Sequence, residues 1–291
     1  MLLADCHVGI DGIGLIGGSL ASALAASGCA RSVRGWDTDG DVLLFAEKEG
    51  IIGGAADSLE DLVKGADLLI LAVPLEKIEE EGRKARSLAS VRPMAVMDVG
   101  SAKASIMEKL CPLWGERYLG FHPMAGKETG GVANASPDLF RRAVCALVPG
   151  PETSPEVVSL GRELAESIGA DTVLLGAQEH DGIVACTSHA PILLAMGLAL
   201  AAGEFWAELP HLPLMAAGGF RDTSRLAGGP SWLVSDLWTK NGPAMRKVLD
   251  RVLEKLAEMR DASPAELSEM ADRASAARIG ILERSPERWR G

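Results

Sequence analysis

The sequence predicts an α/β fold over residues 1–176, followed by an all-helical region over residues 177–291. Up to Leu175, short apolar runs alternate with helical segments, which is the pattern of a parallel sheet with crossover helices. From Gln178 onward, the longer segments repeat with the period of a helix, and no comparable strand pattern follows. A chain of 291 residues is long enough for two such domains.

The first strand leads into a glycine-rich turn with the spacing G-x-G-x-x-G, formed by Gly12, Gly14 and Gly17. Gly12 allows a tight turn, Gly14 lets the backbone approach a pyrophosphate, and Gly17 lets the following helix pack on the strand. Leu15 and Ile16 then lie at the helix N-terminus, which faces the phosphates. The turn predicts a Rossmann-type dinucleotide-binding unit.

Asp37 strengthens this prediction because it follows a second short run, Ser32–Trp36, twenty residues after Gly17. A carboxylate there accepts hydrogen bonds from the adenosine ribose diol and repels a 2′-phosphate, and no arginine directly follows it. We therefore expect NAD rather than NADP. The alternative is a glycine-rich turn that binds no ligand. This alternative is disfavoured because strand, glycines, helix, second strand and acid follow one another in the order of a dinucleotide-binding unit.

The remaining elements follow from apolar period and from glycine or proline at segment ends. Further strands are expected at Asp67–Val73, Met94–Asp98, Tyr118–Phe121, Ala143–Val148 and Asp171–Leu175. Helices of the first domain are expected at Ser19–Ser27, Asp41–Glu49, Ser58–Lys64, Leu75–Ala89, around Ile106–Leu110, and at Pro155–Ile168. The second domain is expected to contain helices at Glu179–Gly203, Pro213–Ala217, Trp232–Lys240, Pro243–Met259 and Pro264–Ile281.

Several candidate site residues follow strand ends, where ligands bind in open α/β sheets. Val73 and Pro74 end the run that begins at Asp67, and Ser101 follows Met94–Asp98. His122 precedes Pro123 and is therefore held extended. Taken singly, Ser101 fits a helix N-cap and His122 fits a buried structural histidine. Their placement by successive strands on one edge favours a shared functional role.

Polar residues of the helical region gather in two places, Gln178–Asp181 with Ser188–His189, and Phe220–Arg225. Arg221 and Arg225 are four residues apart, so on a helix they repel unless an anion lies between them. Their spacing fits a carboxylate-binding pair and a surface pair near Asp222 equally well.

Composition narrows the function classes. A net charge of −11 without a basic cluster argues against a nucleic-acid partner. Five scattered cysteines without a C-x-x-C pair fit a reducing cytoplasm, and no secretory signal or metal-ligand spacing occurs. The longest apolar run, Ala190–Gly203, has fourteen residues and is too short to span a bilayer, so we expect it to form a buried helix. From the cysteines, the missing secretory signal and the missing metal-ligand spacing, we expect a cytoplasmic protein that binds no metal.

Specific motifs resemble the prephenate/arogenate dehydrogenase (TyrA) family of tyrosine biosynthesis over roughly residues 8–241. The motifs are Gly12–Leu20, Asp98–Lys103, His122–Gly126, Gln178–Asp181, Ser188–Pro191 and Gly219–Arg225. The resemblance implies a Rossmann domain, a helical domain that forms a homodimer, and an active site in the cleft between them. The implied reaction is the NAD-dependent oxidative decarboxylation of prephenate to 4-hydroxyphenylpyruvate. Arogenate, which would give tyrosine directly, is the alternative substrate.

The resemblance also implies roles for individual residues. His122 corresponds to the acceptor of the proton of the substrate hydroxyl, with Ser101 as its hydrogen-bonding companion and a cofactor contact. Arg225 corresponds to the arginine that holds a substrate carboxylate. The pocket is further lined by Arg221, His189 and Glu128, and His189 is the next candidate should His122 not be the base.

The chain departs from the family pattern at Ile192, where the family often has histidine, and at Val234, where it often has tryptophan. Asp11 is polar where the first strand normally stays apolar. After Asp261 only a short helical tail remains, so we expect no regulatory module of the usual size and any tyrosine inhibition to be competitive with substrate. Two alternative functions are a β-hydroxyacid or imine dehydrogenase that uses Lys240 and a nonenzymatic NAD sensor. The joint presence of Ser101, His122 and Arg225 disfavours the sensor, and the motif around His122 has no role in the other dehydrogenases.

Overall fold

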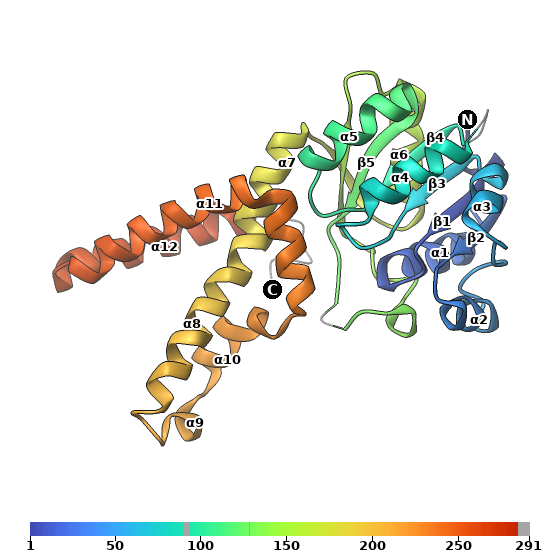
Figure 1. Ribbon diagram of the computed structural model, residues 1–291. Coiled ribbons are helices and arrows are strands. Elements are labelled where there is room, and N and C mark those ends of the chain that lie inside the picture. Colours follow the sequence, from blue (N-terminus) through green and yellow to red (C-terminus); the bar gives the residue numbers. More distant parts are fainter. Residues whose placement is uncertain (90–92, 128, 285–291) are drawn as a thin grey trace. The chain divides into compact units, whose positions relative to one another are not determined.

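The computed structural model describes residues 1–89, 93–127 and 129–284 (Figure 1). The chain divides into two compact units, residues 1–180 with the chain from Glu269 onward, and Asp181–Ser268. The division within the chain thus lies four residues beyond the predicted boundary between residues 176 and 177.

The first unit contains a seven-stranded sheet with the strand order β2-β1-β3-β4-β5-β6-β7. The strands are β1 (His7–Asp11), β2 (Ser32–Trp36), β3 (Leu68–Leu71), β4 (Ala95–Asp98), β5 (Tyr118–Pro123), β6 (Val144–Pro149) and β7 (Asp171–Leu174). Every residue of β3, β4 and β5 is buried, which explains why their sequences are apolar without alternation. The predicted strands are therefore all present.

Strand direction is less uniform than the sequence suggests. β1 to β5 are parallel, whereas β6 runs antiparallel to β5 and β7 runs parallel to β6. Parallel neighbours need a crossover, usually a helix, but the described part of the connection from β5 to β6 holds only a short 3-10 turn, Val132–Asn134. The chain therefore reverses at this point.

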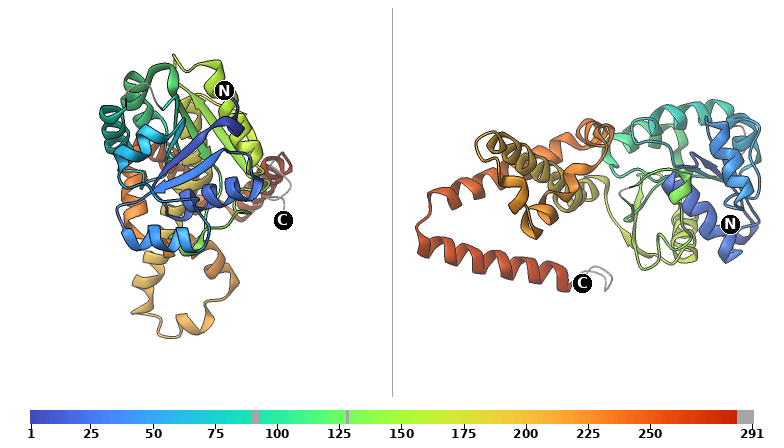
Figure 2. Two further views of the ribbon diagram at one scale, coloured as in Figure 1. Left: turned by 90° about the vertical axis from the view of Figure 1, so that its right-hand side faces the viewer. Right: turned by 90° about the horizontal axis from the view of Figure 1, so that it is seen from below.

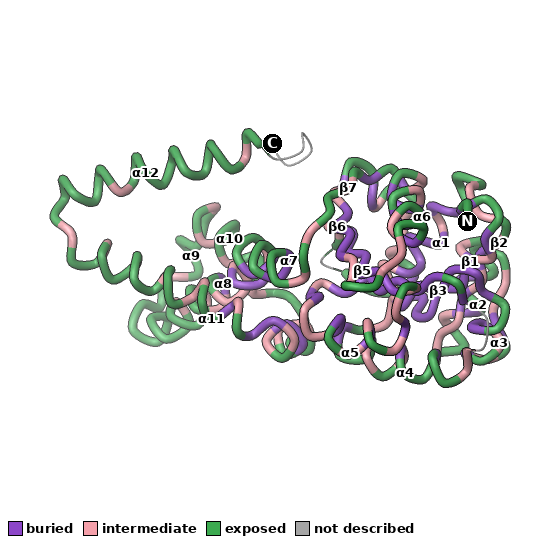
Figure 3. Tube along the Cα trace, turned by 90° about the horizontal axis from the view of Figure 1, so that it is seen from above, coloured by how far each residue is buried: buried purple, intermediate pink, exposed green. Residues whose placement is uncertain are grey.

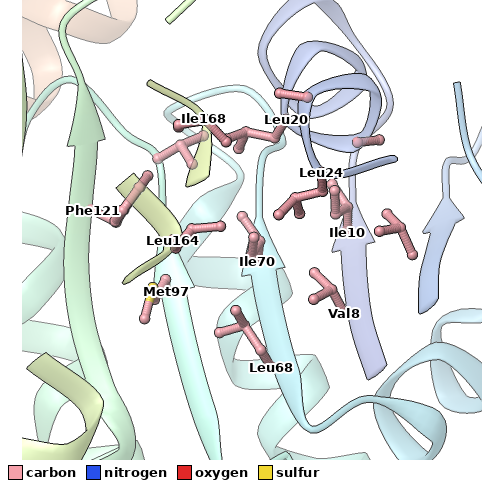
Figure 4. Close-up of a cluster of buried hydrophobic side chains, with 14 of the residues drawn as sticks. Val8, Ile10, Leu20, Leu24, Leu68, Ile70, Met97, Phe121, Leu164 and Ile168 are labelled. Atoms are coloured by element: carbon pink, nitrogen blue, oxygen red, sulfur yellow. The ribbon is translucent and has the colours of Figure 1, made fainter. Parts of the chain in front are cut away.

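Helices cover both faces of the sheet (Figure 2). On one face, α1 (Leu15–Ser27) and α6 (Pro155–Ser167) pack on strand residues, with Leu24 beside Ile10 and Leu164 beside Ile70 (Figure 4). This unit also contains α2 (Gly40–Lys48), α3 (Leu59–Gly65), α4 (Ile78–Leu88) and α5 (Ala104–Trp114). α4 packs tightly on α5, since a Cβ at Gly82 would lie 2.8 Å from Leu110. The helices on the two faces of the sheet bury the apolar core, and this packing fixes the positions of the strand ends.

The chain beyond the sheet is helical, as predicted, and much of its surface is exposed within one chain (Figure 3). It contains α7 (Ala177–Val184), a π-helical turn (Ala185–His189), α8 (Ala190–Trp206), α9 (Leu212–Met215), α10 (Gly218–Ser224), a 3-10 turn (Arg225–Gly228), α11 (Ser231–Asp261) and α12 (Pro264–Glu283). α11 has a kink at Asn241, whose φ of −130° and ψ of 18° are not helical. Pro243 accounts for the break between the two predicted helices.

One helical run among the described residues, Ala177–Trp206, is long and apolar enough by length and composition to cross a membrane. This helical run is longer than the fourteen-residue apolar run because α7 and the π-helical turn precede it. The prediction that this segment is too short to span a bilayer was therefore wrong. Only 28% of its apolar window is buried within this chain, which also corrects the expectation of a buried helix. A single such helix is weak evidence for a membrane protein, because core helices of soluble proteins satisfy the same criteria.

Candidate active site

The glycine turn has the geometry that the sequence predicts. Gly12 has a φ of +95°, and a Cβ there would lie 2.7 Å from the backbone of Ala72. A Cβ at Gly17 would collide with the carbonyl oxygen of Gly12, so only glycine lets α1 approach the strand this closely. Gly14 is the N-cap of α1, and a Cβ there would meet no atom within 4 Å. The open space in front of the helix N-terminus fits a pyrophosphate group.

Asp37 lies directly after β2, beside this turn. Its Oδ2 accepts a hydrogen bond of 2.8 Å from the backbone N–H of Ile13, and its Oδ1 accepts one of 3.0 Å from Asp39. Each carboxylate oxygen keeps a further lone pair for a ribose hydroxyl. These two backbone contacts hold the acid where the sequence predicts a dinucleotide ribose.

The other predicted cofactor residues lie at the same carboxyl edge. Leu15 and Ile16 form the first turn of α1 and are half-buried. Val73 follows β3 and is half-buried, and Pro74 is exposed. The strand order places β1 between β2 and β3, so these segments flank the glycine turn.

Ser101 belongs to a loop that a buried polar network holds in place. The carboxylate of Asp98, at the end of β4, accepts hydrogen bonds from Lys103 Nζ at 2.6 Å and from the Tyr118 hydroxyl at 2.6 Å. The N–H of Gly100 donates to the same carboxylate at 2.9 Å. Burial, with Asp98 nearby, raises the pKa of Tyr118 well above its ordinary value, so the phenol remains a donor. The sequence analysis gave Lys103 no structural role. In the structure, its side chain is completely buried.

The start of α5 bears on the helix-cap role of Ser101. α5 begins at Ala104 with Lys103 as its N-cap residue, so Ser101 is not the N-cap of this helix. Ser101 is half-buried at the end of β4. Its hydroxyl is therefore not committed to the commonest structural use of a serine at that position.

His122 lies near the end of β5, next to β4 in parallel register, with Asp98 opposite Gly120. Ser101 and His122 thus follow neighbouring strands to one edge, as predicted. The His122 side chain is buried, and its Nδ1 lies 2.8 Å from Nε2 of His180, which is also buried. The sequence placed His180 in a polar cluster but gave no sign of this contact.

His189 has a defined partner in the second unit. The side-chain nitrogen of Asn241 donates a hydrogen bond of 2.9 Å to the carbonyl oxygen of Asp181, and it lies 3.1 Å from Nδ1 of His189. A carbonyl can only accept, so this contact fixes which end of the amide is nitrogen. His189 Nδ1 is consequently an acceptor, and a neutral His189 carries its proton on Nε2. In that form it is a hydrogen-bond donor and lacks the lone pair that a base requires at Nε2.

The two arginines lie in consecutive elements of the second unit. Arg221 lies in α10, is 77% exposed, and pairs with Asp222 at 2.9 Å, as in the surface interpretation of the spacing. Arg225 begins the 3-10 turn after α10 and is exposed within one chain. Glu128, the remaining predicted pocket residue, lies outside the described residues. No group of three His, Cys, Asp or Glu able to hold a metal occurs in the described part of the chain.

Comparison with known proteins decides the family. Residues 20–174 match the model for the nucleotide-binding domain of prephenate dehydrogenase, and residues 176–270 match the model for its dimerization domain. The chain is 32% identical over 252 residues to prephenate dehydrogenase of Bacillus subtilis, covering 86% of this chain and 67% of that protein. The chain belongs to the prephenate dehydrogenase family.

Two further members of the family match over most of their own length. Cyclohexadienyl dehydrogenase of Zymomonas mobilis is 30% identical, with 88% of each chain covered. A crystal structure of prephenate dehydrogenase from A. aeolicus with hydroxyphenyl propionate and NAD+ superimposes with a TM-score of 0.87 at 25% identity, covering 95% of this chain and 97% of that one. The Rossmann-type domain followed by a helical domain is therefore the fold of this family.

Asp11, the polar residue that the sequence analysis singled out in the first strand, is a buried carboxyl group. Asp11 ends β1 and is 2% exposed, and its Oδ2 is buried without a hydrogen-bond partner among the described residues. Burial, with the nearby carboxylate of Glu81, raises the pKa of Asp11 to about 7. A carboxyl group with this pKa is largely protonated below neutrality.

Proposed function

We propose that this chain catalyses the NAD-dependent oxidative decarboxylation of prephenate to 4-hydroxyphenylpyruvate, a step of tyrosine biosynthesis. The observation that carries the proposal is the position of His122. A buried imidazole, which can accept a proton near neutral pH, lies at the strand edge that also bears the glycine turn and Asp37. Family membership supports the same reaction.

NAD, when bound, supplies the hydride acceptor. The chain would hold it through the glycine turn at Gly12, Gly14 and Gly17, through the first turn of α1, and through Asp37 at the ribose. The positive φ of Gly12, the close approach at Gly17 and the open space at Gly14 fit this cofactor. Asp37 would disfavour a 2′-phosphate, so NAD is the preferred form.

His122 would accept the proton of the ring hydroxyl while hydride leaves the same carbon. Ser101, at the end of the neighbouring strand, would hydrogen-bond with it. Loss of the ring carboxylate as carbon dioxide then gives an aromatic product, which makes the reaction effectively irreversible. The family relationship sets aside the β-hydroxyacid dehydrogenase, which would have used Lys240.

The second unit would supply substrate contacts. The guanidinium of Arg225 matches a substrate carboxylate, and Arg221 would add positive charge. The hydrogen bond between Asn241 and His189 leaves His189 Nε2 as a donor, which suits a carboxylate or keto oxygen. A keto oxygen accepts such a bond and an ammonium group does not, which favours prephenate over arogenate.

The substrate choice is tested by the appearance of NADH, followed by its absorbance, with prephenate or arogenate as substrate. We expect a higher kcat/KM with prephenate, and with NAD than with NADP. Arogenate is the second candidate because the Zymomonas mobilis relative is a cyclohexadienyl dehydrogenase. A protein that binds NAD but oxidises neither substrate would instead be a sensor, and the proposal would be wrong.

We further propose that the chain is a cytoplasmic homodimer formed through its helical unit. The match to the dimerization domain supports the dimer. Large apolar side chains are exposed on this unit within a single chain, including Leu200, Phe205, Trp206 and Trp232. A second copy would remove such surface from water.

A further inference from the structure

His122 and His180 form a direct contact between two ring nitrogens inside the first unit. His122 Nδ1 lies 2.8 Å from His180 Nε2, and the two rings meet edge to face with an interplanar angle of 68°. His122 is 9% exposed and His180 is 1% exposed. A hydrogen bond between two ring nitrogens requires that one of them carries the proton and the other accepts it.

Both rings are held by regular secondary structure. His122 pairs with Ala146 in the ladder between β5 and β6. His180 lies in the first turn of α7, where its N–H donates to the carbonyl of Gly176 at 2.9 Å. The contact therefore joins a strand end to a helix start, and neither backbone is a free loop.

The proposed reaction determines which nitrogen must hold the shared proton. Because Nδ1 of His122 faces His180, the proposed reaction would use Nε2, the other ring nitrogen, to accept the proton from substrate. A neutral imidazole has a lone pair on Nε2 only when its proton is on Nδ1. His122 Nδ1 must then donate to His180 Nε2, and His180 must carry its own proton on Nδ1. The opposite arrangement places a proton on His122 Nε2 and prevents it from acting as a base.

We propose that His180 is a positioning residue that keeps His122 in the tautomer able to accept the substrate proton. This inference rests on the proposed function. His180 Nε2 accepts the Nδ1–H bond before the reaction, and it accepts the same bond from the imidazolium that forms when His122 takes the proton. A hydrogen bond from a charged donor is stronger, so the contact also favours the charged product form of His122. His180 itself need not gain or lose a proton.

Two variants of His180 test whether a hydrogen-bond acceptor is needed at the position of Nε2. Both replace histidine by a side-chain amide, so they have the same polarity and differ in length. In His180→Gln, the side-chain oxygen lies the same number of bonds from Cα as Nε2 of histidine, so it can accept the bond from His122. In His180→Asn, the oxygen is one bond short. We expect His180→Asn to lower kcat ~10- to 100-fold with KM for prephenate nearly unchanged, as part of the ~10² to 10⁴ that a positioned base contributes. We expect His180→Gln to restore kcat to within about threefold of wild type, because the tautomer is kept.

A spectroscopic measurement decides the tautomer without using activity. The chain has only five histidines, so long-range ¹H–¹⁵N correlation spectra of ¹⁵N-histidine protein can be assigned with a His122→Asn variant. Neutral His122 should carry its proton on Nδ1 in wild type and in His180→Gln, and should shift toward the Nε2–H form in His180→Asn. His211→Asn, which changes an exposed histidine of the second unit, is the control.

The inference is overturned if neutral wild-type His122 carries its proton on Nε2, or if His180→Asn keeps the wild-type kcat. It is also overturned if both amide variants lose kcat equally although both are folded, because this would indicate a purely structural role. Should His180→Asn not fold, the wild-type spectrum and His180→Gln still decide the question. If wild-type protein oxidises neither prephenate nor arogenate, the proposed function fails, and the spectra still report the tautomer.

Discussion

Two buried histidines of this protein are held in different proton arrangements by their neighbours. His189 accepts a bond at Nδ1 from Asn241, so its Nε2 is a donor. His122 contacts another imidazole at Nδ1, so its Nε2 can keep a lone pair. Residue type therefore identifies candidates for proton transfer, but the hydrogen bond at the other nitrogen decides which of them can be the base.

The first prediction at this scale concerns the base. We expect His122→Asn to lower kcat by ~10² to 10⁴ with KM nearly unchanged, because a general base acts in the transition state. The low-pH limb of the rate profile should disappear with it. Steady-state kinetics across pH check this. Near-wild-type kcat, or an acid limb with the same apparent pKa, would show that another group accepts the proton.

The second prediction concerns substrate binding. Removing a guanidinium that pairs with a carboxylate should cost on the order of 2 to 5 kcal/mol, so we expect Arg225→Ala chiefly to raise KM for prephenate. Arg221→Ala should have a smaller effect, because Arg221, which pairs with Asp222, is proposed only to add positive charge and not to hold the carboxylate. Initial-rate measurements on both variants test this. A large fall in kcat with unchanged KM for Arg225→Ala would contradict the assignment.

The third prediction uses the buried Asp11. Its pKa is raised from 3.8 to about 7 by burial and by Glu81, so the native state holds this proton more tightly than the unfolded state. The resulting stabilisation is complete below the unfolded pKa, declines as pH rises, and is lost once pH passes about 7. A shift of this size corresponds to ~4 kcal/mol.

Chemical unfolding of wild type and Asp11→Asn between pH 4 and pH 8 isolates this effect, since other titrating groups are common to both proteins. The stability of wild type relative to Asp11→Asn should fall over this range. A difference that is independent of pH would mean that Asp11 titrates normally in the folded protein.

At the scale of elements, the loop between β4 and α5 depends on a buried ion pair. Lys103 and Asp98 are both fully buried at 2.6 Å, with Tyr118 as a third partner. We expect Lys103→Met to lower the free energy of unfolding by ~3 to 5 kcal/mol, because it leaves a buried carboxylate without its counter-ion. Combining it with Asp98→Asn should recover part of the loss.

The control for this prediction is Lys64→Met. Lys64 pairs with Glu60, but the lysine side chain is 58% exposed, so its loss should cost about 1 kcal/mol or less. Denaturant titrations of the three variants measure these differences. Equal effects for Lys103→Met and Lys64→Met would show that the buried pair does not hold the loop.

At the scale of the whole molecule, the helical unit exposes apolar surface that a second copy would cover. Leu214 and Met215 are each 83% exposed within one chain. We expect light scattering during gel filtration to give twice the 30.5 kDa chain mass. Replacing apolar surface of the helical unit with glutamate, as in Leu200→Glu with Trp206→Glu, should weaken association. A chain mass of 30.5 kDa for wild type at assay concentrations would contradict the dimer.

Features that depend on neighbours along the chain could be predicted from the amino-acid sequence alone. The glycine turn, Asp37, the buried strands and the helical second region were all predicted, because backbone preference and apolar period act over a few residues. Placing Ser101 and His122 on one edge required only the additional rule that successive parallel strands end together. The motifs likewise sufficed for the family, which the comparisons confirm.

The partners of the buried polar groups could not be predicted from the sequence and were found in the three-dimensional fold. His122 meets His180 across 58 residues, His189 meets Asn241 across 52, and Tyr118 meets Asp98 across 20. The reversal of β6 and the isolation of Asp11 are likewise invisible in a local pattern. A buried polar atom must find its partner wherever packing brings one near, and packing joins segments without regard to their separation in sequence. Sequence therefore identified which residues could carry the chemistry, and the fold determined where their protons lie.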